Sequence, residues 1–473
     1  MQTSFSSPSA RTTRRLAVAA GLTAALLWAA VPAHAQDKAT LDLLVKKGVI
    51  TQDEADAVAK QAAVVVTPKE AAVKKLQLEG LLQVQFDWLT TKDKAAHAIE
   101  PPATSQFYIR RAYLGAIADL GNGWGGEILL DFAAGAKPPA APQSTTNAGT
   151  QNSFEKAIIT KKIDDYGLAT AGFQKVQWDQ EENTPSSQLL TIERSVATRY
   201  FDEAWGGSTT GRLGFGNRHT GLFWNGVVPG FDGFYYGVGL TNGIQSDLNY
   251  GNSANGVAAY NEFGGWVNLG YSGTYTPIGL YYKVGINAGY AGEANSVSGL
   301  AKIDGYNQNN AISGYNPYFT VSYAGFSLAG EFLQAFVQNG RQSGAGAAAV
   351  YSKAAPYGFN LTPSYKINSQ WELAAKYSYL STNGRGTAIN PVDPNAQNTL
   401  NVAVPVGATA VQNFDNVNEF YAGVNYYIIG YDLKLSAGYE FDQYTGRQTF
   451  LGGSFNGARA NVNGVRTQLQ LLF

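Results

Sequence analysis

The feature that most constrains this chain is an alternation of apolar and polar residues that recurs from Leu76 to the C-terminus. In the first such segment, LQLEGLLQVQFDWL, most even positions are apolar, and most odd positions hold glutamine, glutamate or aspartate. A period of two is typical of a β-strand with one apolar and one polar face, because successive side chains point to opposite sides. The sequence therefore predicts strands for this part of the chain.

The predicted strands are numerous and similar in length. Further examples are WGGEILLDF from Trp124, GLYYKVGINAGY from Gly279, QWELAAKYSYL from Gln370 and YDLKLSAGYEF from Tyr431. About sixteen segments of roughly ten residues follow one another, which is the length that a tilted strand needs to cross a bilayer. Tyrosine and tryptophan lie near many strand ends, as the aromatic girdles of a membrane barrel would require.

The predicted connections are of two kinds, and the two kinds alternate along the chain. Short turns are predicted at 119–123, 164–167, 324–325, 368–369 and 429–430, and long loops at 133–153, 178–208, 243–260, 291–315, 338–353 and 381–416. Short turns at one end and long loops at the other are typical of a transmembrane β-barrel, and not of a sandwich or propeller. We therefore predict an all-β fold, a transmembrane antiparallel β-barrel of about 16 strands over residues 76–473.

The composition argues against several other classes of protein. The chain has 34 basic and 35 acidic residues, so no positive charge excess favours a nucleic-acid partner. It has no Cys and only 3 His, without a second ligand at metal-binding spacing, and it lacks an H-E-x-x-H motif. We therefore expect no enzyme, no cofactor and no metal site.

The first residues resemble an export signal. Arg11, Arg14 and Arg15 precede the apolar run LAVAAGLTAALLWAA, and Ala33-His34-Ala35 fits the small-x-small pattern of a cleavage site. A charged start, a short apolar run and such a site predict a signal peptide over residues 1–35 that is removed from the mature protein.

A different pattern occupies residues 36–75. Leu41, Leu44 and Val45 have helical spacing before Gly48, and Thr51 begins a capping box of the T-x-x-E type. The sequence predicts a periplasmic helical or linker segment before the first strand.

The last strand ends the chain on an aromatic residue, Phe473. In lipid every strand edge must be paired, so the last strand has to close onto the first. Period two then places Val465, Leu469, Leu471 and Phe473 outward, and Arg466, Gln468 and Gln470 inward. A terminal phenylalanine resembles the signal that the assembly machinery of outer-membrane barrels reads, so Phe473 is predicted to act in assembly.

Several stretches resemble the phosphate-selective porin O and P family. FYIRRAYLGAIADLGNGWGGEILLDFA carries Arg110-Arg111-Ala112 at that family's Arg-Arg-Ala, and GFQKVQWDQEENTPSSQLLTIERS runs from Gly172 to Ser195. Residues Lys175, Glu182, Ser186, Ser187, Glu193, Arg194 and Ser195 fill the family's positions in that second stretch. The resemblance implies a homotrimeric porin of the Gram-negative outer membrane, a passive channel whose loop after the fifth strand folds inward as a constriction.

The same loop, 178–208, is dense in charged residues. Charged side chains in a narrow pore set ion selectivity. On the next strand Leu213 and Phe215 share one face, which predicts that Arg212 and Arg218 share the lumenal one. The predicted constriction and ion path comprises Lys175, Glu182, Glu193, Arg194, Arg199, Arg212, Arg218 and Lys283.

The partners expected from these features are outer-membrane lipid, further copies of the chain, and small anions or other small hydrophilic solutes. Carboxylates on the strands bring the lumenal charge close to even, so anion or phosphate preference stays one option among several. A sugar-specific porin, with Tyr281 as one lumenal aromatic residue, and a structural or adhesive surface barrel are the alternatives.

The signal peptide gives the first prediction. N-terminal sequencing of the protein taken from outer membranes should begin at or near Gln36, because cleavage after Ala35 removes the charged and apolar start. A mature protein that still begins at Met1 would contradict it.

Overall fold

The computed structural model describes residues 73–93, 104–133, 153–202, 213–242, 263–292, 311–343, 350–384, 412–449 and 459–473. The chain divides into the units Met1–Ala71 and Ala72–Phe473, and the fold described below is that of the second unit. The predicted signal peptide, and the predicted helical segment up to residue 72, lie outside the described residues.

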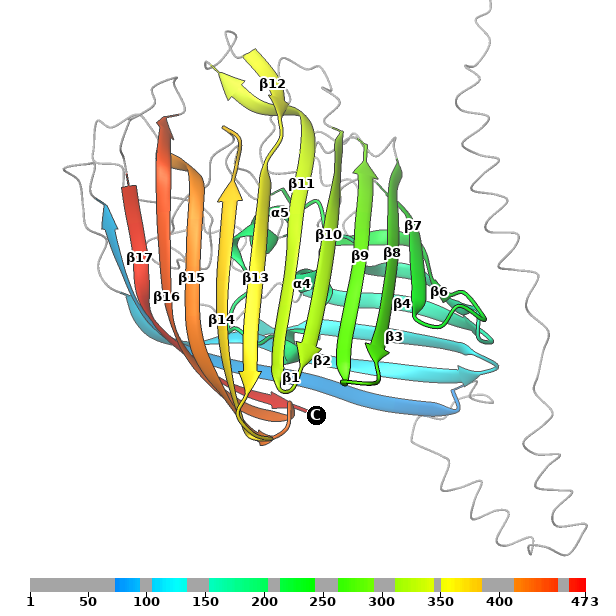
Figure 1. The fold of residues 1–473 in the computed structure, drawn as a ribbon. Coiled ribbons are helices and arrows are strands. Elements are labelled where there is room, and N and C mark those ends of the chain that lie inside the picture. Colours follow the sequence, from blue (N-terminus) through cyan, green and yellow to red (C-terminus); the bar gives the residue numbers. More distant parts are fainter. Residues whose placement is uncertain are drawn as a thin grey trace, which may run out of the picture. The chain divides into compact units, whose positions relative to one another are not determined.

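Strands dominate the second unit (Figure 1). In chain order they are β1 Lys75–Asp93, β2 Thr104–Gly121, β3 Trp124–Asp131, β4 Ser153–Ile163, β5 Gly167–Lys175, β6 Arg218–Val227, β7 Phe234–Asn242, β8 Phe263–Tyr275, β9 Leu280–Ala291, β10 Ile312–Tyr323, β11 Phe326–Ser343, β12 Val350–Ala354, β13 Tyr357–Lys366, β14 Trp371–Ser381, β15 Gln412–Ile429, β16 Leu433–Thr449 and β17 Arg459–Leu472. Some are much longer than the ten residues predicted, such as β1 with 19.

The barrel has 16 strands, as predicted, because β12 and β13 act as one. Both pair with β11 and follow one another along it. Pro356 lies in the gap between them, and a proline has no N–H to donate to the ladder. Its carbonyl still accepts the backbone N–H of Ala335 at 3.1 Å, so the wall continues past the interruption.

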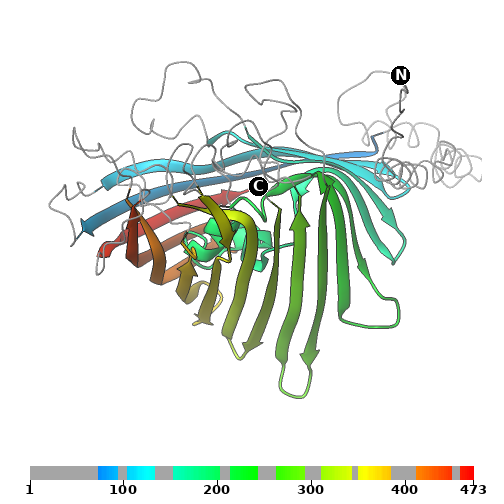
Figure 2. The same ribbon diagram turned by 90° about the horizontal axis from the view of Figure 1, so that it is seen from above.

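The barrel closes by antiparallel pairing of β1 with β17, from Leu81 opposite Leu472 to Asp93 opposite Ala460. Figure 2 shows these blue and red strands side by side. Phe473 extends the seam, because its backbone exchanges hydrogen bonds of 2.7 and 3.0 Å with Gly80. A Cβ at Gly80 would lie 2.3 Å from the Phe473 ring, so the glycine makes room for the ring.

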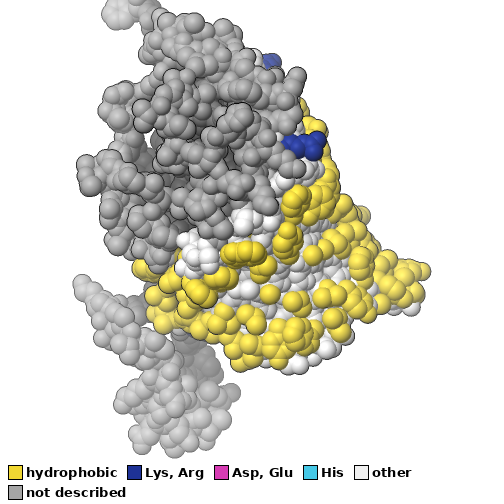
Figure 3. All heavy atoms as spheres, turned by 90° about the vertical axis from the view of Figure 1, so that its left-hand side faces the viewer, with side chains coloured by type: hydrophobic (Ala, Val, Ile, Leu, Met, Phe, Trp, Pro, Cys, Tyr) yellow, Lys and Arg dark blue, Asp and Glu magenta, His cyan; other side chains and the backbone are white. Residues whose placement is uncertain are grey.

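The two faces of the wall separate as predicted. On β17 Val465, Leu469 and Leu471 are exposed, whereas Arg466 and Gln470 are buried inside. Figure 3 shows hydrophobic side chains spread over the outer surface of the described part. A surface of this kind fits lipid, since hydrocarbon offers no hydrogen bonds to polar groups.

The short turns occur where they were predicted. Backbone conformations with positive φ at Asn122, Asp164 and Ala324 mark three of them. Two more short connections, 228–233 and 276–279, join β6 to β7 and β8 to β9, and the sequence analysis missed them. No helix among the described residues is long and apolar enough to cross a membrane.

The segment between β5 and β6 folds into the barrel (Figures 1 and 2). This inner loop comprises residues 176–217, of which 176–202 and 213–217 are described. It contains α4 Gln180–Asn183, the 3₁₀ turn η2 Ser186–Gln188 and α5 Val196–Asp202. Every residue of α5 is buried, so part of the lumen is filled by packed side chains.

The interior packing of the inner loop corrects one prediction. Leu213 and Phe215 precede β6, which begins at Arg218, and they do not face lipid. Both are fully buried in an apolar cluster with Trp178, Tyr200 and other side chains. The face assigned to Arg212 from their alternation was therefore derived wrongly, and Arg212 itself lies outside the described residues.

The closing seam generates the second prediction. Deleting Phe473 removes two backbone hydrogen bonds, each contributing about 1 kcal/mol, together with the ring beside Gly80. We expect severalfold less heat-modifiable barrel, with normal single-channel conductance in what does assemble, because the lumen is unchanged. Phe420→Ala removes an outward ring far from the seam and is the matched control. Equal yields of both variants and of the wild type would contradict the prediction.

Candidate functional site

The inner loop is fastened to one side of the barrel wall. On β11 the Glu331 carboxylate accepts the backbone N–H groups of Gln180 at 2.8 Å and Glu181 at 3.2 Å. On β15 Glu419 accepts the N–H of Val196 at 2.5 Å. These contacts fix both helices of the loop.

The 3₁₀ turn is held by donors from the next strands. Lys434 Nζ donates to the carbonyls of Ser187 and Leu189 at 3.2 and 2.9 Å, and Gln470 Nε2 donates to that of Ser187 at 3.1 Å. These anchors come from β11 to β17. The opposite wall, β2 to β6, contacts the loop through Arg110 and Lys175 but is not covered by α5, and it lines an opening.

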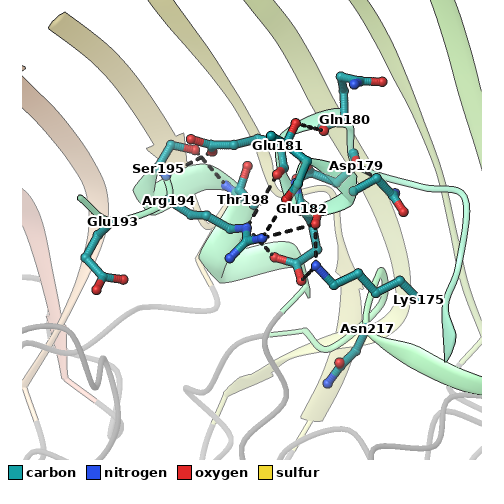
Figure 4. A network of polar contacts seen from close by, with 12 residues as sticks. Lys175, Asp179, Gln180, Glu181, Glu182, Glu193, Arg194, Ser195, Thr198 and Asn217 are labelled. Carbon is teal, nitrogen blue, oxygen red and sulfur yellow. Dashed lines mark hydrogen bonds and ion pairs between the residues drawn. The ribbon is translucent and has the colours of Figure 1, made fainter. Parts of the chain in front are cut away.

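Glu182 on α4 gathers one cluster of charges (Figure 4). Its carboxylate forms ion pairs with Lys175 Nζ and Arg194 Nε, both at 2.8 Å. Arg194 also donates to the carbonyls of Glu182 and Thr184 at 3.2 and 3.0 Å. Burial raises the pKa of Glu182, but the charges of Arg194, Lys175 and Arg218 outweigh it and hold that pKa well below its usual range.

Glu193 gathers a second cluster. Arg110 binds its two carboxylate oxygens at 2.7 and 3.0 Å, and Gln85 Nε2 donates to it at 3.0 Å. Burial again raises the pKa, and the charges of Arg110, Arg111 and Arg199 more than offset it, so that Glu193 stays ionised. The two hydrogen bonds from Arg110 to Glu193 connect the inner loop to β2.

Arg110 and Arg111 both belong to the interior, although they are neighbours on one strand. The β1–β2 register shifts between Gln83 and Val84, and the extra residue on β2 lets two successive side chains turn inward. Arg111 Nη1 donates to Gln83 Oε1 at 2.8 Å, and no carboxylate pairs with it among the described residues. The sequence analysis noted this pair only as part of the family pattern, since a bulge leaves no trace in simple alternation.

The remaining predicted residues are placed differently from one another. Arg218 pairs with Glu155 beside the Glu182 cluster. Lys283 lies apart from both clusters: its Nζ contacts Gln180 Oε1 at 3.2 Å and sits over the rings of Tyr235 and Tyr318. The structure therefore joins Lys175, Glu182, Arg194 and Arg218 in one group, and Glu193 and Arg199 in a second.

A cavity of about 440 Å³ lies between the inner loop and the uncovered wall. Its lining includes Lys175, Asn183 and Ser186 from the loop and its start, and Tyr113, Glu155, Lys156, Arg218 and Asn225 from the wall. The lining is rich in polar groups of both signs, which suits water and hydrated solutes.

Other lumenal charges are paired with one another. Arg466 contacts Asp87 at 2.7 Å and Glu440 at 2.8 Å, and Lys376 contacts Glu419 at 2.6 Å. Among the residues that the structure describes, no three His, Cys, Asp or Glu side chains are grouped as metal ligands would be.

Comparison with known proteins gives the family. The model of the phosphate-selective porin O and P family matches residues 93–473. No curated protein sequence matches the chain.

Solved structures show the same fold at low sequence identity. The anion-selective porin from Comamonas acidovorans is 12% identical, with a TM-score of 0.53, over 84% of this chain and 99% of that one. The outer-membrane channel DcaP of Acinetobacter baumannii is also 12% identical, with a TM-score of 0.50, over 87% of this chain and 100% of that one.

The family match covers the whole barrel except the first strand, and the closed barrel, its apolar outer surface and its polar cavity agree with it. These findings point to a channel rather than to an enzyme. The chain belongs to the phosphate-selective porin O and P family, and it is an outer-membrane porin, a channel for small solutes.

Proposed function

We propose that the inner loop is the constriction of this porin and that the channel is a passive one with a preference for small anions. The observation that carries the proposal is the charge beside the uncovered wall. The basic side chains there are Lys156, Lys175, Arg110, Arg111, Arg194, Arg199 and Arg218, and the carboxylates are Glu79, Glu127, Asp131, Glu155, Glu182 and Glu193. Cations outnumber carboxylates at this point of the lumen.

The carboxylates and the cations also differ in how well their charges are balanced by neighbours. Glu182 and Glu193 are each surrounded by several cations, so their charges are more than balanced. Arg111 has no carboxylate of its own among the described residues. In a narrow, partly desolvated passage, an uncompensated guanidinium attracts a mobile anion more strongly than it would in bulk water.

A sugar-specific channel finds less support. The hydroxyls of Tyr235 and Tyr318 bond to one another at 3.0 Å, and Asn268 donates to Tyr318 at 2.9 Å. Both rings lie over glycines, Gly270 and Gly285, against the wall. Rings held flat in this way do not form the continuous stacking track that sugar rings would need.

The outer surface supports a homo-oligomer. Outward positions on β2 to β5 include alanines beside larger apolar side chains: Ala116 lies opposite Ile128, which is exposed, and Ala171 lies opposite Ile159, which is also exposed. Directly opposite residues share a face, and the same side of the barrel carries the exposed rings of Phe107 and Phe154. An apolar face of this kind can pack against another barrel, and we propose a homotrimer, formed after export and removal of residues 1–35.

Arg111 provides the test of ion preference. Arg111→Gln removes one positive charge and leaves no carboxylate behind, so the reversal potential in a tenfold salt gradient should shift toward cations. A shift of several millivolts is expected, out of about 59 mV for an ideally selective pore.

Lys161→Gln is the matched control, because Lys161 is exposed at the turn end of β4 and contacts the carbonyl of Asn122. The two-residue comparison separates local charge from total charge. If Arg111→Gln leaves the reversal potential where Lys161→Gln leaves it, the anion preference is wrong and the channel is a general one.

The oligomer is tested on the outward face of β2 to β5. Ala171→Trp places a bulky ring between barrels, so detergent extracts should show folded monomer in place of trimer. Ala288→Trp, on the outward face of β9, should leave the trimer intact. Trimer of normal stability in Ala171→Trp would show that this face is not the interface.

A further inference from the structure

Four carboxyl groups meet where the inner loop rests on β11. Asp179 and Glu181 come from the start of the loop, Asp202 from the end of α5, and Glu331 from the wall. Asp179, Asp202 and Glu331 are buried, with exposed fractions of 0%, 1% and 6%. None of the four forms an ion pair with a basic residue of the described part, unlike Glu182 and Glu193 nearby.

Few groups around the Asp202 carboxyl could stabilise a negative charge on it. Apart from Asp179, neither of its oxygens has a hydrogen-bond partner among the described residues. A proton on one of the two carboxyls allows a hydrogen bond between Asp179 and Asp202. A Cβ at Gly216 would lie 1.8 Å from Asp202 Oδ1 and 2.2 Å from the Trp178 ring, so these groups are packed against one another. A buried ionised carboxylate without a partner is strongly disfavoured, and the group keeps a proton instead.

The pKa directions agree with this packing. Burial raises the pKa of Asp179 well above its usual value, and the nearby charge of Asp202 raises it further. Burial likewise raises the pKa of Asp202 well above its usual value, and the charges of Glu182 and Glu331 add to that rise. The pair therefore carries at least one proton at neutral pH.

Unlike Asp202, Glu331 accepts hydrogen bonds at both of its carboxylate oxygens. Besides the N–H groups of Gln180 and Glu181, it accepts Asn316 Nδ2 at 3.0 Å and Asn360 Nδ2 at 2.8 Å. Asn316 is itself bonded to Asn287 at 2.8 Å, so the anchor is continuous with β9 and β10. The loop contact thus depends on the oxygens of Glu331, which lie beside a carboxyl pair that holds at least one proton.

We propose that Glu331 is a positioning residue for the inner loop, and that Asp179 and Asp202 form a protonated pair that keeps the loop on Glu331 and releases it at alkaline pH. When the pair loses its proton, negative charges accumulate beside Glu331 with no cation to balance them. Their repulsion favours movement of α4 and α5 away from β11, where water can solvate the carboxylates.

The direction of the pH effect follows from the raised pKa values. Because protonation is easier in the packed loop than in solvent, the contribution of the pair is complete below the ordinary carboxyl pKa of about 4. It is lost as the pH rises through the raised pKa of the packed state. The other charged groups that face the pair come from three elements: Glu181 and Glu182 from α4, Lys175 from the end of β5, and Glu331 from β11.

Lys175 does not replace the missing counter-ion. It lowers the pKa of Asp202 only weakly, after burial and the neighbouring carboxylates, because its Nζ is paired with Glu182 at 2.8 Å. Lys283 reaches only as far as Gln180. Asp179 and Asp202 therefore titrate without a free cation beside them.

The test measures the loop itself before conduction. Amide hydrogen exchange of the detergent-solubilised trimer is followed from about pH 5 to about pH 10, as protection factors, which remove the chemical effect of pH on exchange. Protection of α4 and α5 in the wild type should fall about tenfold or more across the alkaline part of this range. Protection of β11 and β13 should not change.

Asp202→Asn is the decisive variant, because an amide keeps the shape and cannot gain a charge. It should retain protection at alkaline pH, whereas Asp131→Asn, at a carboxylate on β3, should behave like the wild type. Glu331→Gln should lose protection at every pH, since an amide cannot accept both backbone N–H groups in the same way. Equal alkaline loss in Asp202→Asn and the wild type, or no loss in the wild type, would overturn the proposal.

A cross-link covers the case in which Glu331→Gln fails to fold. Ala197 on α5 lies against Gly358 on β13, and the chain has no native cysteine. Ala197→Cys with Gly358→Cys, once oxidised, should abolish the alkaline loss of protection in α5, and reduction should restore it. Persistence of the loss in the oxidised protein would contradict release from the wall.

The proposal rests on the constriction role in one respect only, its effect on current. Single-channel recordings over the same pH range should show larger current fluctuations at alkaline pH in the wild type and none in Asp202→Asn. Loss of protection without any change in current would support release of the inner loop from Glu331 and show that the inner loop is not the constriction.

Discussion

The closed hydrogen-bond ladder is the constraint on which the rest of this structure depends. Lipid offers no partner to a backbone N–H or C=O, so a wall of strands is stable only when its first and last members pair. That requirement explains why β1 and β17 are joined over thirteen residue pairs and why Phe473 and Gly80 continue the seam. Once the wall is closed, its outward face favours apolar side chains, and charged side chains such as Arg466, Lys376 and Glu419 are buried inside.

The packing inside the lumen is determined separately from the wall. The inner loop crosses it and is held by Glu331, Glu419 and Lys434 on one side, which leaves the wall from β2 to β6 uncovered. Apolar packing around α5 closes the covered side. The charged clusters at Glu182 and Glu193 form the edge of the loop, so in the proposed channel the charge and width of the passage depend on how firmly this segment rests on the wall.

Alternation in the sequence was sufficient to predict the strands of the barrel wall, but not the structure of the inner loop inside it. It predicted the faces of β17, the number of strands and five of the turns, because each strand position in a barrel has only two environments. It failed where the backbone leaves the regular ladder. The bulge turns both Arg110 and Arg111 inward, which simple alternation does not allow, and Leu213 and Phe215 are buried in a core that has no counterpart in a strand pattern. Contacts across the lumen, such as Gln180 to Glu331, join residues far apart in the chain and carry no local signal.

The two sides of the inner loop, one along the passage and one against β11, differ in the sign of their charge. Along the proposed passage, neighbouring cations keep Glu182 and Glu193 ionised. Behind the loop, Asp179 and Asp202 lie without cations and hold protons. Ionisation of Asp179 and Asp202 would add negative charge behind the passage that we propose favours anions, and it would push the loop away from Glu331. Protonation of the pair therefore serves position and electrostatics together, since a neutral pair leaves the field of the passage to Arg111, Arg218 and Lys175.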